Sequence, residues 1–276
     1  MTMARLNGLL SPASAQKVFY PGDRAPGPGF DPSTLPLEIR DARTLQAGAA
    51  SEATCFRDHG FVLLRQRSVA RDAEIDSAEI EALVRNRLFP GRRLEIAQWL
   101  KPVCRGGEED AVYADWVHQD FGLSADDFAR NLAGIVTPEA AGAWQARYAC
   151  DDVAGCVAIS FWGTVGMQGP LRHMPLALCD PGSVEMADVI AAAPASDGGS
   201  YHIALRFNDG QRWYHYPEMR GDELLAFKLF ECSKDDPAPA RLRSVFHAAF
   251  DDPATPPDAE RRRSGEHRLA VMLLAD

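Results

Sequence analysis

Long apolar runs are missing from this sequence: no stretch of it approaches the roughly 20 apolar residues that a membrane-spanning helix needs. Residues 1–16 contain one arginine and only a short apolar patch, which is weak as a secretory signal. We therefore expect no membrane association and a location in the cytoplasm.

Basic residues are also in deficit. The chain has 29 lysines and arginines against 39 aspartates and glutamates, which gives a net charge of −10. Proteins that grip nucleic acids neutralise phosphates with lysine and arginine, so we expect no nucleic-acid partner. The six cysteines are scattered and form no Cys-x-x-Cys pair, so neither a zinc knuckle nor a disulfide framework is indicated. Reduced thiols are expected.

The chain has 276 residues, 46% of them hydrophobic, enough for one large domain or two small ones. Proline and glycine interrupt the first fifty residues at Pro21-Gly22, Pro26 to Gly29, Pro32 and Pro36. Such punctuation is typical of irregular chain. We expect residues 1–50 to form an irregular N-terminal segment packed on the core, and residues 51–276 to form a single domain.

Short apolar and β-rich runs bounded by polar residues predict strands. These runs lie at 60–64, 153–162, 201–207, 212–216, 224–230, 242–250 and 268–274. The third and fourth runs flank Asn208-Asp209-Gly210, and Asp-Gly is a strong hairpin signal, so we expect these two strands to pair with each other.

Helices are fewer and lie in the first two-thirds of the chain. Residues 77–89 place apolar side chains on one face, and Pro90 ends the segment. Further helices are expected after Ser124, which forms a capping box with Asp127, after Thr137, and from 180 to 190. The nearly all-strand end of the chain predicts a mainly-β fold with flanking helices, either an antiparallel barrel or a double-sheet jelly roll.

His118-Gln119-Asp120 is the most informative local motif. In extended backbone, residues i and i+2 point to the same face, so His118 and Asp120 can direct an imidazole and a carboxylate at one point. One more histidine would complete the 2-His-1-carboxylate triad of non-haem Fe(II) oxygenases. The alternative is that His118 caps the loop that follows it.

His247 is the best third ligand. It lies in an apolar, strand-like run from 243 to 250, where a buried imidazole needs a polar partner. The alternative is a core histidine whose hydrogen bonds are satisfied locally. If His118, Asp120 and His247 share a metal ion, their distant segments must belong to one folded core.

A basic stretch, residues 261–268, follows soon after His247. Arg262, Ser264, Glu266 and Arg268 share one face if this stretch is extended. An arginine with a serine two residues later can clamp a carboxylate, such as the distal carboxylate of 2-oxoglutarate. Arg262 is favoured over Arg268 for this role because of the position of Ser264, although both remain candidates and a solvated basic patch is the alternative.

Two tryptophans flank these motifs. Trp116 and Trp162 are candidates for the lining of a substrate pocket, with core packing as the alternative. Glu223 is interpreted as a residue that closes a turn, not as a base.

Several segments carry a family resemblance. They are Val117-His118-Gln119-Asp120, Phe161-Trp162, Pro175 to Asp180, Trp213 to Pro217, Asp222 to Lys228, His247 to Pro253, and the closing arginine-rich strand. Together they resemble the CmcJ-like and gibberellin-desaturase-like oxidoreductases of secondary metabolism, which belong to the Fe(II)/2-oxoglutarate-dependent oxygenases. The resemblance runs from about Gly60 to the C-terminus. In the Ser264-Gly265-Glu266-His267-Arg268 segment, only the two apolar positions of the family pattern are replaced.

This resemblance implies a double-stranded β-helix (jelly-roll) core in which His118, Asp120 and His247 are the iron ligands. It also implies a non-haem iron dioxygenase that uses Fe(II), 2-oxoglutarate and O2. Such an enzyme hydroxylates, desaturates or cyclises a small-molecule substrate, here a secondary metabolite, through a ferryl intermediate.

Two other functions are alternatives. A methyltransferase of secondary metabolism would need a glycine-rich turn after its first strand for the cofactor, and the sequence has no convincing GxGxG. A non-catalytic jelly-roll binding protein would differ from the oxygenase in its metal content.

Overall fold

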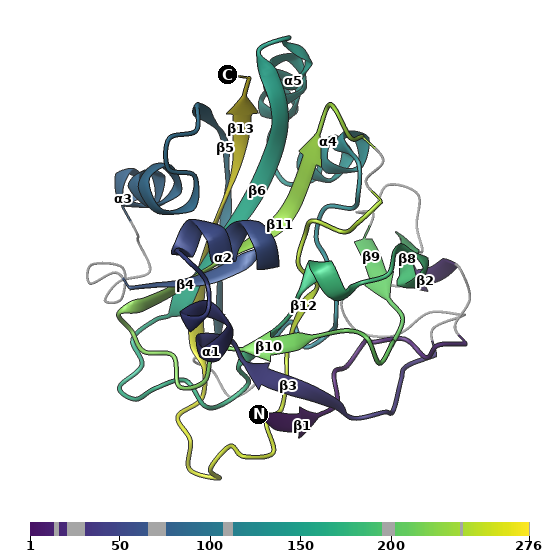
Figure 1. Cartoon of the computed structure of the whole chain (residues 1–276), viewed down its shortest axis with the longest axis vertical. Coiled ribbons are helices and arrows are strands. Elements are labelled where there is room, and N and C mark those ends of the chain that lie inside the picture. Colours follow the sequence, from purple (N-terminus) through teal and green to yellow (C-terminus); the bar gives the residue numbers. More distant parts are fainter. Residues whose placement is uncertain are drawn as a thin grey trace.

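The computed structural model describes residues 1–13, 17–20, 31–65, 76–106, 113–194, 202–237 and 240–275. Two five-stranded sheets face each other, and helices flank them (Figure 1). The largest apolar cluster lies between the sheets, because it takes side chains such as Leu178 from one and Phe227 from the other.

One of the two sheets has much longer strands, and we call it the larger sheet. It is antiparallel throughout and has the order β4-β11-β6-β13-β5. Its strands are β4 (Phe61–Arg65), β11 (Glu223–Ser233), β6 (Val153–Thr164), β13 (Arg263–Leu274) and β5 (Leu94–Gly106). Side chains alternate between its two faces as strand geometry requires. On β6, Ala158 and Trp162 join the cluster between the sheets, whereas Ile159 and Phe161 join a second cluster on the outer face.

The smaller sheet has the order β1-β3-β10-β7-β12. Its strands are β1 (Thr2–Ala4), β3 (Leu37–Asp41), β10 (Trp213–His215), β7 (Leu176–Cys179) and β12 (His247–Ala249). The β3–β10 pair is parallel and the others are antiparallel. A separate three-stranded sheet contains β2 (Lys17–Tyr20), β8 (Val189–Pro194) and β9 (His202–Leu205).

Helices cover the outer face of the larger sheet and one of its ends. The helices are α1 (Ala42–Ala47), α2 (Glu52–His59), α3 (Ser77–Leu83) with a π-helical turn (Val84–Leu88), α4 (Ala125–Ala133) and α5 (Pro138–Ala149). Phe56 of α2 and Leu83 of α3 pack on the outer face of the sheet. Phe128 of α4 and Trp144 of α5, with ring centroids 4.8 Å apart, close one end of the core between the sheets.

The predicted fold class holds, and several local predictions are confirmed. Ser124 and Asp127 form the expected capping box, and Thr137 caps α5. The 242–250 run is a strand only at 247–249. β5 was not predicted, and its apolar residues do not alternate regularly; it lies at the edge of its sheet, where Pro102 is tolerated.

Two local predictions are wrong. The Asn208-Asp209-Gly210 turn forms, with the Gly210 amide donating to the Asn208 side chain, but its flanking strands do not pair with each other. β9 pairs with β8, whereas β10 pairs with β3 and β7, so partners elsewhere in the chain outweigh the local turn. The segment from 180 to 190 holds two 3₁₀ turns (Pro181–Ser183 and Met186–Asp188) instead of a helix.

The N-terminal fifty residues contain more regular structure than their prolines and glycines indicate. β3 lies inside the smaller sheet between β1 and β10. Leu6 and Leu9 pack in an apolar cluster on the outer face of that sheet. The Pro21-Gly22 and Pro26 to Gly29 motifs lie outside the described residues, and the division of the chain at residue 50 stays a prediction.

In the part of the chain that the structure describes, every helix is too short or too polar to cross a bilayer. None of the six cysteines, all of which are described, forms a disulfide in the structure.

Glu223 closes the start of β11 through an ion pair with Arg43. The guanidinium donates to both carboxylate oxygens, at 2.7 and 2.8 Å, and Glu223 also accepts from the Arg220 amide. Burial alone would raise the pKa of Glu223, but these hydrogen bonds outweigh it and lower the pKa below its ordinary value of 4.5. The side chain therefore closes a turn and ties α1 to the larger sheet.

We expect Glu223→Gln to lower the free energy of unfolding at pH 7 by about 1–3 kcal/mol, because it weakens a buried charged pair. A lowered pKa stabilises the folded state above the ordinary value and loses that effect as the pH falls through the folded-state value. The difference from wild type in urea unfolding should therefore be full at pH 7 and shrink below pH 4.5. Glu218→Gln, in an exposed pair with Arg172, is the control and should change little. A difference independent of pH would contradict this account.

Candidate metal centre

A pair of backbone hydrogen bonds joins the two segments that carry the predicted ligands. The His118 amide donates to the His247 carbonyl at 3.1 Å, and the His247 amide donates back to the His118 carbonyl at 3.0 Å. Residues paired this way in an antiparallel ladder project their side chains to the same face. The two imidazole rings accordingly lie with centroids 4.3 Å apart.

Each imidazole is oriented by a neighbouring carbonyl. His118 Nδ1 lies 2.5 Å from the Trp116 carbonyl, and His247 Nδ1 lies 3.2 Å from the Val245 carbonyl. Because a carbonyl can only accept, each Nδ1 carries the proton and donates. This tautomer leaves the Nε2 lone pair of both rings available for a metal ion.

Asp120 completes the set. One Asp120 oxygen lies 3.7 Å from His118 Nε2, and the three candidate ligand atoms of His118, Asp120 and His247 all lie within 4.8 Å of one another. Two imidazoles and one carboxylate are the donor set of the facial triad, which suits Fe(II) and leaves coordination positions open. The side chains present therefore fit the expected metal.

The three side chains are largely enclosed by the fold. His118 and Asp120 each keep 20% of their side-chain surface accessible, and His247 is buried. Burial lowers the pKa of His118 and of His247, and it is the largest cause in both cases. The lowered pKa values keep the imidazoles neutral at pH 7, and the neutral form is the one that binds metals.

Gln119, between the two candidate ligands, points the other way and is fully buried. Its amide nitrogen lies 2.6 Å from the Leu229 carbonyl, 3.0 Å from Ser244 Oγ and 3.1 Å from the Gly122 carbonyl. Its amide oxygen accepts from the backbone amides of Phe121 and Gly122 in the turn that follows. One side chain thus fixes the turn after the motif and joins it to β11 and to the segment before His247.

Arg262 is a buried cation without a carboxylate partner among the described residues. It is 2% exposed, and its guanidinium carbon lies 4.2 Å from the Tyr113 ring centroid and 5.6 Å from that of Trp162. Nη1 donates to the Met174 carbonyl at 2.6 Å, whereas Nε is buried with no hydrogen-bond partner in the described structure. Burial lowers the pKa of Arg262 to about 10, so it stays charged at pH 7. A buried charge of this kind calls for an anion.

Arg262 directly precedes β13, and the other three residues predicted to share its face lie on that strand. Ser264 is buried, opposite Thr164 of β6. Glu266 accepts from Ser160 Oγ at 2.8 Å, and burial raises its pKa. Arg268 donates Nη2 to the Lys101 carbonyl at 3.0 Å and, like Arg262, has a buried Nε without a described partner. The strand therefore presents these polar groups on the face that continues into the core between the sheets at Ala270, in agreement with its alternation.

The two predicted tryptophans have different surroundings. Trp162 is 5% exposed and contacts Arg262. Trp116 packs against the N-terminal segment at Gly8. A Cβ at this position would collide with the indole ring, and the positive φ of Gly8 also favours glycine. Sequence reasoning missed Tyr113, whose hydroxyl donates to the Arg262 carbonyl at 2.9 Å, and the role of Gln119. Neither residue has a spacing signal of its own.

Comparisons with known proteins agree with this geometry. Residues 117–272 match the family described as "Oxidoreductase/YMDC permease-like domain". The matched region is more than half of the chain and includes every predicted ligand.

Two curated relatives share part of the sequence. The hydroxylase/desaturase asaB of Aspergillus flavus is 31% identical over 131 residues, which cover 41% of this chain and 56% of that protein. The hydroxylase/desaturase efuI of Hormonema carpetanum is 28% identical over 114 residues, which cover 36% of this chain and 39% of that protein. The chain thus spans about half, or less, of the length of these relatives.

Solved structures of an iron and alpha-ketoglutarate-dependent endoperoxidase, NvfI, match nearly the whole chain. One has a TM-score of 0.65 at 19% identity and covers 99% of this chain and 98% of that one. A variant of the same enzyme has a TM-score of 0.64 at 18% identity, covering 98% of each chain. At this identity the likeness shows the fold, and it confirms the predicted jelly-roll core with flanking helices.

We expect Gln119→Leu to lower the free energy of unfolding by about 2–4 kcal/mol, because it leaves several buried backbone and hydroxyl groups without a partner. Chemical denaturation measures this change. Gln98→Leu is the matched control, since the Gln98 amide makes a single local bond to the Trp99 carbonyl, and it should cost clearly less. Equal losses in the two variants would show that Gln119 does not join these segments.

Proposed function

The chain belongs to the oxidoreductase/YMDC permease-like family, and on that premise we propose that it is an Fe(II)/2-oxoglutarate-dependent oxygenase acting on a small molecule. The membership agrees with the resemblance to the CmcJ-like and gibberellin-desaturase-like oxidoreductases. The observation that carries the proposal is the convergence of two imidazoles and one carboxylate, whose candidate ligand atoms lie within 4.8 Å of one another, with both Nδ1 atoms next to backbone carbonyls.

His118, Asp120 and His247 would hold the iron. When bound, Fe(II) would allow O2 to oxidise an unreactive C–H bond of the substrate, with 2-oxoglutarate supplying the other two electrons that O2 needs. The task of this chain is to fix the ligands and exclude water. The His118–His247 backbone pair sets the ligand spacing, and Phe227, whose ring centroid lies 4.8 Å from that of His247, shields the imidazole from the core side.

Arg262 would hold the distal carboxylate of 2-oxoglutarate, assisted by Ser264. Its full burial, the unpartnered Nε and the two aromatic rings beside it support this choice over Arg268, which is only partly buried. An anion at Arg262 would compensate a charge that no described carboxylate neutralises. Trp162, beside Arg262, would then lie at the border between the cosubstrate and the substrate.

The reaction would be hydroxylation, desaturation or cyclisation of a secondary metabolite, in the cytoplasm. The names of the two partial relatives, both hydroxylase/desaturases, support the first two outcomes, and the endoperoxidase structures share the fold. The convergent triad favours the oxygenase over a non-catalytic binding protein. No feature of the site favours a methyltransferase.

Removal of a ligand tests the metal centre. We expect His118→Ala, Asp120→Ala and His247→Ala each to lower Fe(II)-dependent succinate formation from 2-oxoglutarate by at least about 100-fold. Anaerobic Fe(II) titration should show weaker binding in the same variants. His267→Gln is the control. His267 lies opposite Phe161 in the ladder between β13 and β6, and Phe161 belongs to the apolar cluster on the outer face of the sheet. If His247→Ala consumed 2-oxoglutarate as fast as wild type, the assignment of His247 would be wrong.

The cosubstrate assignment has its own test. We expect Arg262→Lys to raise the KM for 2-oxoglutarate by about 10- to 100-fold while kcat changes less, because lysine cannot form a bidentate contact. Arg268→Lys should raise that KM by less than Arg262→Lys does. The reverse order would assign the carboxylate to Arg268 and leave the metal triad untouched.

A further inference from the structure

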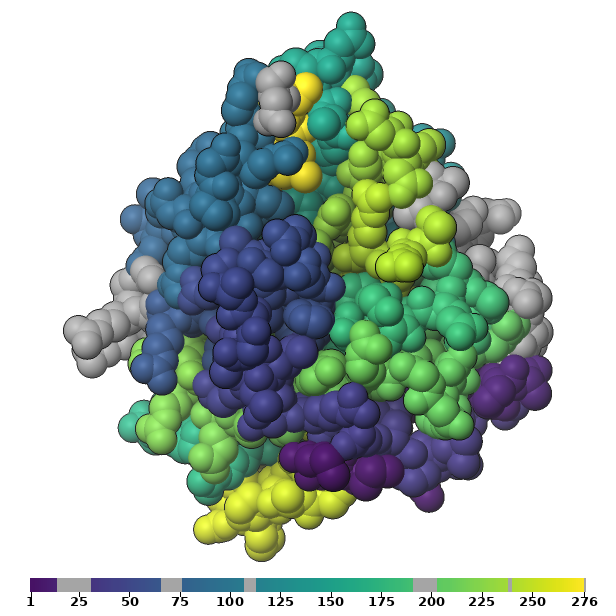
Figure 2. Space-filling view, viewed as in Figure 1, coloured from purple at the N-terminus to yellow at the C-terminus, as the bar shows by residue number. Residues whose placement is uncertain are grey.

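A hollow lies on the outer face of the larger sheet. It is a pocket of about 560 Å³ between α2, the segment after the π-helical turn, and the loop that precedes β12. On the face drawn in Figure 2, α2 (dark blue) and the end of β11 (lime) flank this region. Its volume falls in the range of small-molecule sites.

The floor and one wall of the pocket are apolar. Phe56 of α2 and Phe89 meet edge to face with ring centroids 5.8 Å apart, and Leu88 and Leu273 line the pocket beside them. Ala154 contributes a small side chain from β6. The helices leave this part of the sheet face uncovered.

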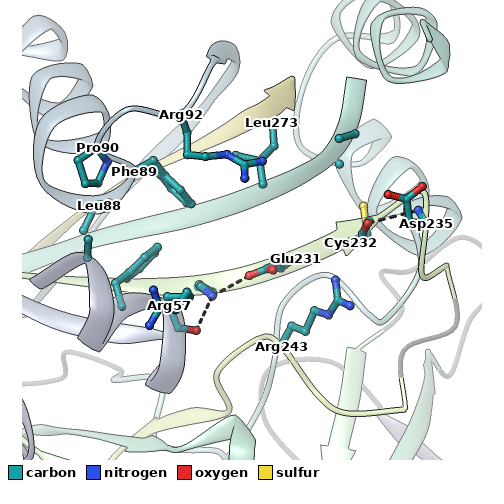
Figure 3. A pocket seen from close by; sticks show the side chains of 16 residues that line it. Arg57, Leu88, Phe89, Pro90, Arg92, Glu231, Cys232, Asp235, Arg243 and Leu273 are labelled. Atoms are coloured by element: carbon teal, nitrogen blue, oxygen red, sulfur yellow. Dashed lines mark hydrogen bonds and ion pairs between the residues drawn. The ribbon is translucent and has the colours of Figure 1, made fainter. Parts of the chain in front are cut away.

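The polar lining carries charges of both signs. It contains four cations and two carboxylates, and three of the cations are in ion pairs, Arg57 with Asp58, Arg243 with Asp236 and Lys228 with Glu231. Arg92 is in no ion pair among the described residues. The cations come from separate elements and are set around the pocket (Figure 3). They are Arg57, Arg92, Lys228 and Arg243, and the carboxylates are Glu231 and Asp235.

Lys228 is the buried cation among them. Its side chain is 7% exposed, its ammonium lies 2.7 Å from Glu231 Oε2 and 3.3 Å from the Arg57 carbonyl, and it sits 5.3 Å from the Phe56 ring centroid. An ammonium has three donors, and these contacts use two of them. One N–H therefore remains for an acceptor that enters the pocket.

We propose that this pocket binds a small organic anion, a carboxylate attached to an apolar body. The apolar floor would take the body, and Lys228 together with Arg92 would take the carboxylate. The larger sheet separates this pocket from the metal centre, because Lys228 points outward while Phe227 and Leu229 face the core between the sheets. The site is therefore independent of the proposed oxygenase function.

Octanoate, a short alkyl carboxylate, is the probe. Calorimetric titration of the full chain should show one saturable site for octanoate. Binding should be at least about tenfold weaker for octylammonium, which has the opposite charge, and for acetate, which lacks the apolar body. Arg92→Glu should weaken octanoate binding by about fivefold or more. Arg93→Glu is the matched control, since the Arg93 side chain donates to the Ala275 carbonyl outside the pocket. The affinity of this variant for octanoate should stay within about twofold of wild type.

Two further variants locate the site. Ala53→Trp, which fills the pocket from α2, should weaken the binding of octanoate and also of 1-octanol, which has the same apolar body without the charge. His118→Ala should leave octanoate binding unchanged. Absence of saturable binding, equal losses in Arg92→Glu and Arg93→Glu, or loss in His118→Ala would overturn the proposal. The last outcome would place octanoate at the candidate metal centre and would say nothing against the oxygenase.

Discussion

The reciprocal hydrogen bonds between the backbones of His118 and His247 are the constraint on which the candidate metal centre depends. They join segments about 130 residues apart and set both imidazoles on one face. Because the same pairing continues the smaller sheet beyond β12, the ligand spacing is a property of the sheet and not of a free loop. Sites built on sheet backbone hold their geometry better than sites on loops.

Burial of charge is the second constraint. A guanidinium enclosed like that of Arg262 is costly unless an anion accompanies it. The chain reduces this cost with two aromatic rings and one carbonyl, which leave Nε unsatisfied. Stability is thus given up at a position that an anionic cosubstrate would compensate, and polar groups left in this state are characteristic of functional sites.

Much of the site was predictable because its signals are local or periodic. The i, i+2 spacing of His118 and Asp120 needs only extended backbone, and the alternation along 262–268 needs only a strand. The hairpin at Asn208 to Gly210 failed because strand partners are chosen by the whole sheet. Tyr113 and Gln119 escaped because their roles depend on distant partners, and no spacing encodes a contact with Arg262 or Leu229.

One irregularity in β11 serves both faces of the larger sheet. A bulge between Lys228 and Phe230 places Leu229 and Phe230 both toward the core between the sheets. The Leu229 carbonyl is thereby the acceptor for Gln119, and the Lys228 carbonyl accepts from the Val245 amide, two residues before His247. The Lys228 side chain meanwhile lies in the outer pocket. A regular strand would alternate strictly, so the bulge is what lets this short segment support the ligand-bearing backbone on one side and present a cation on the other.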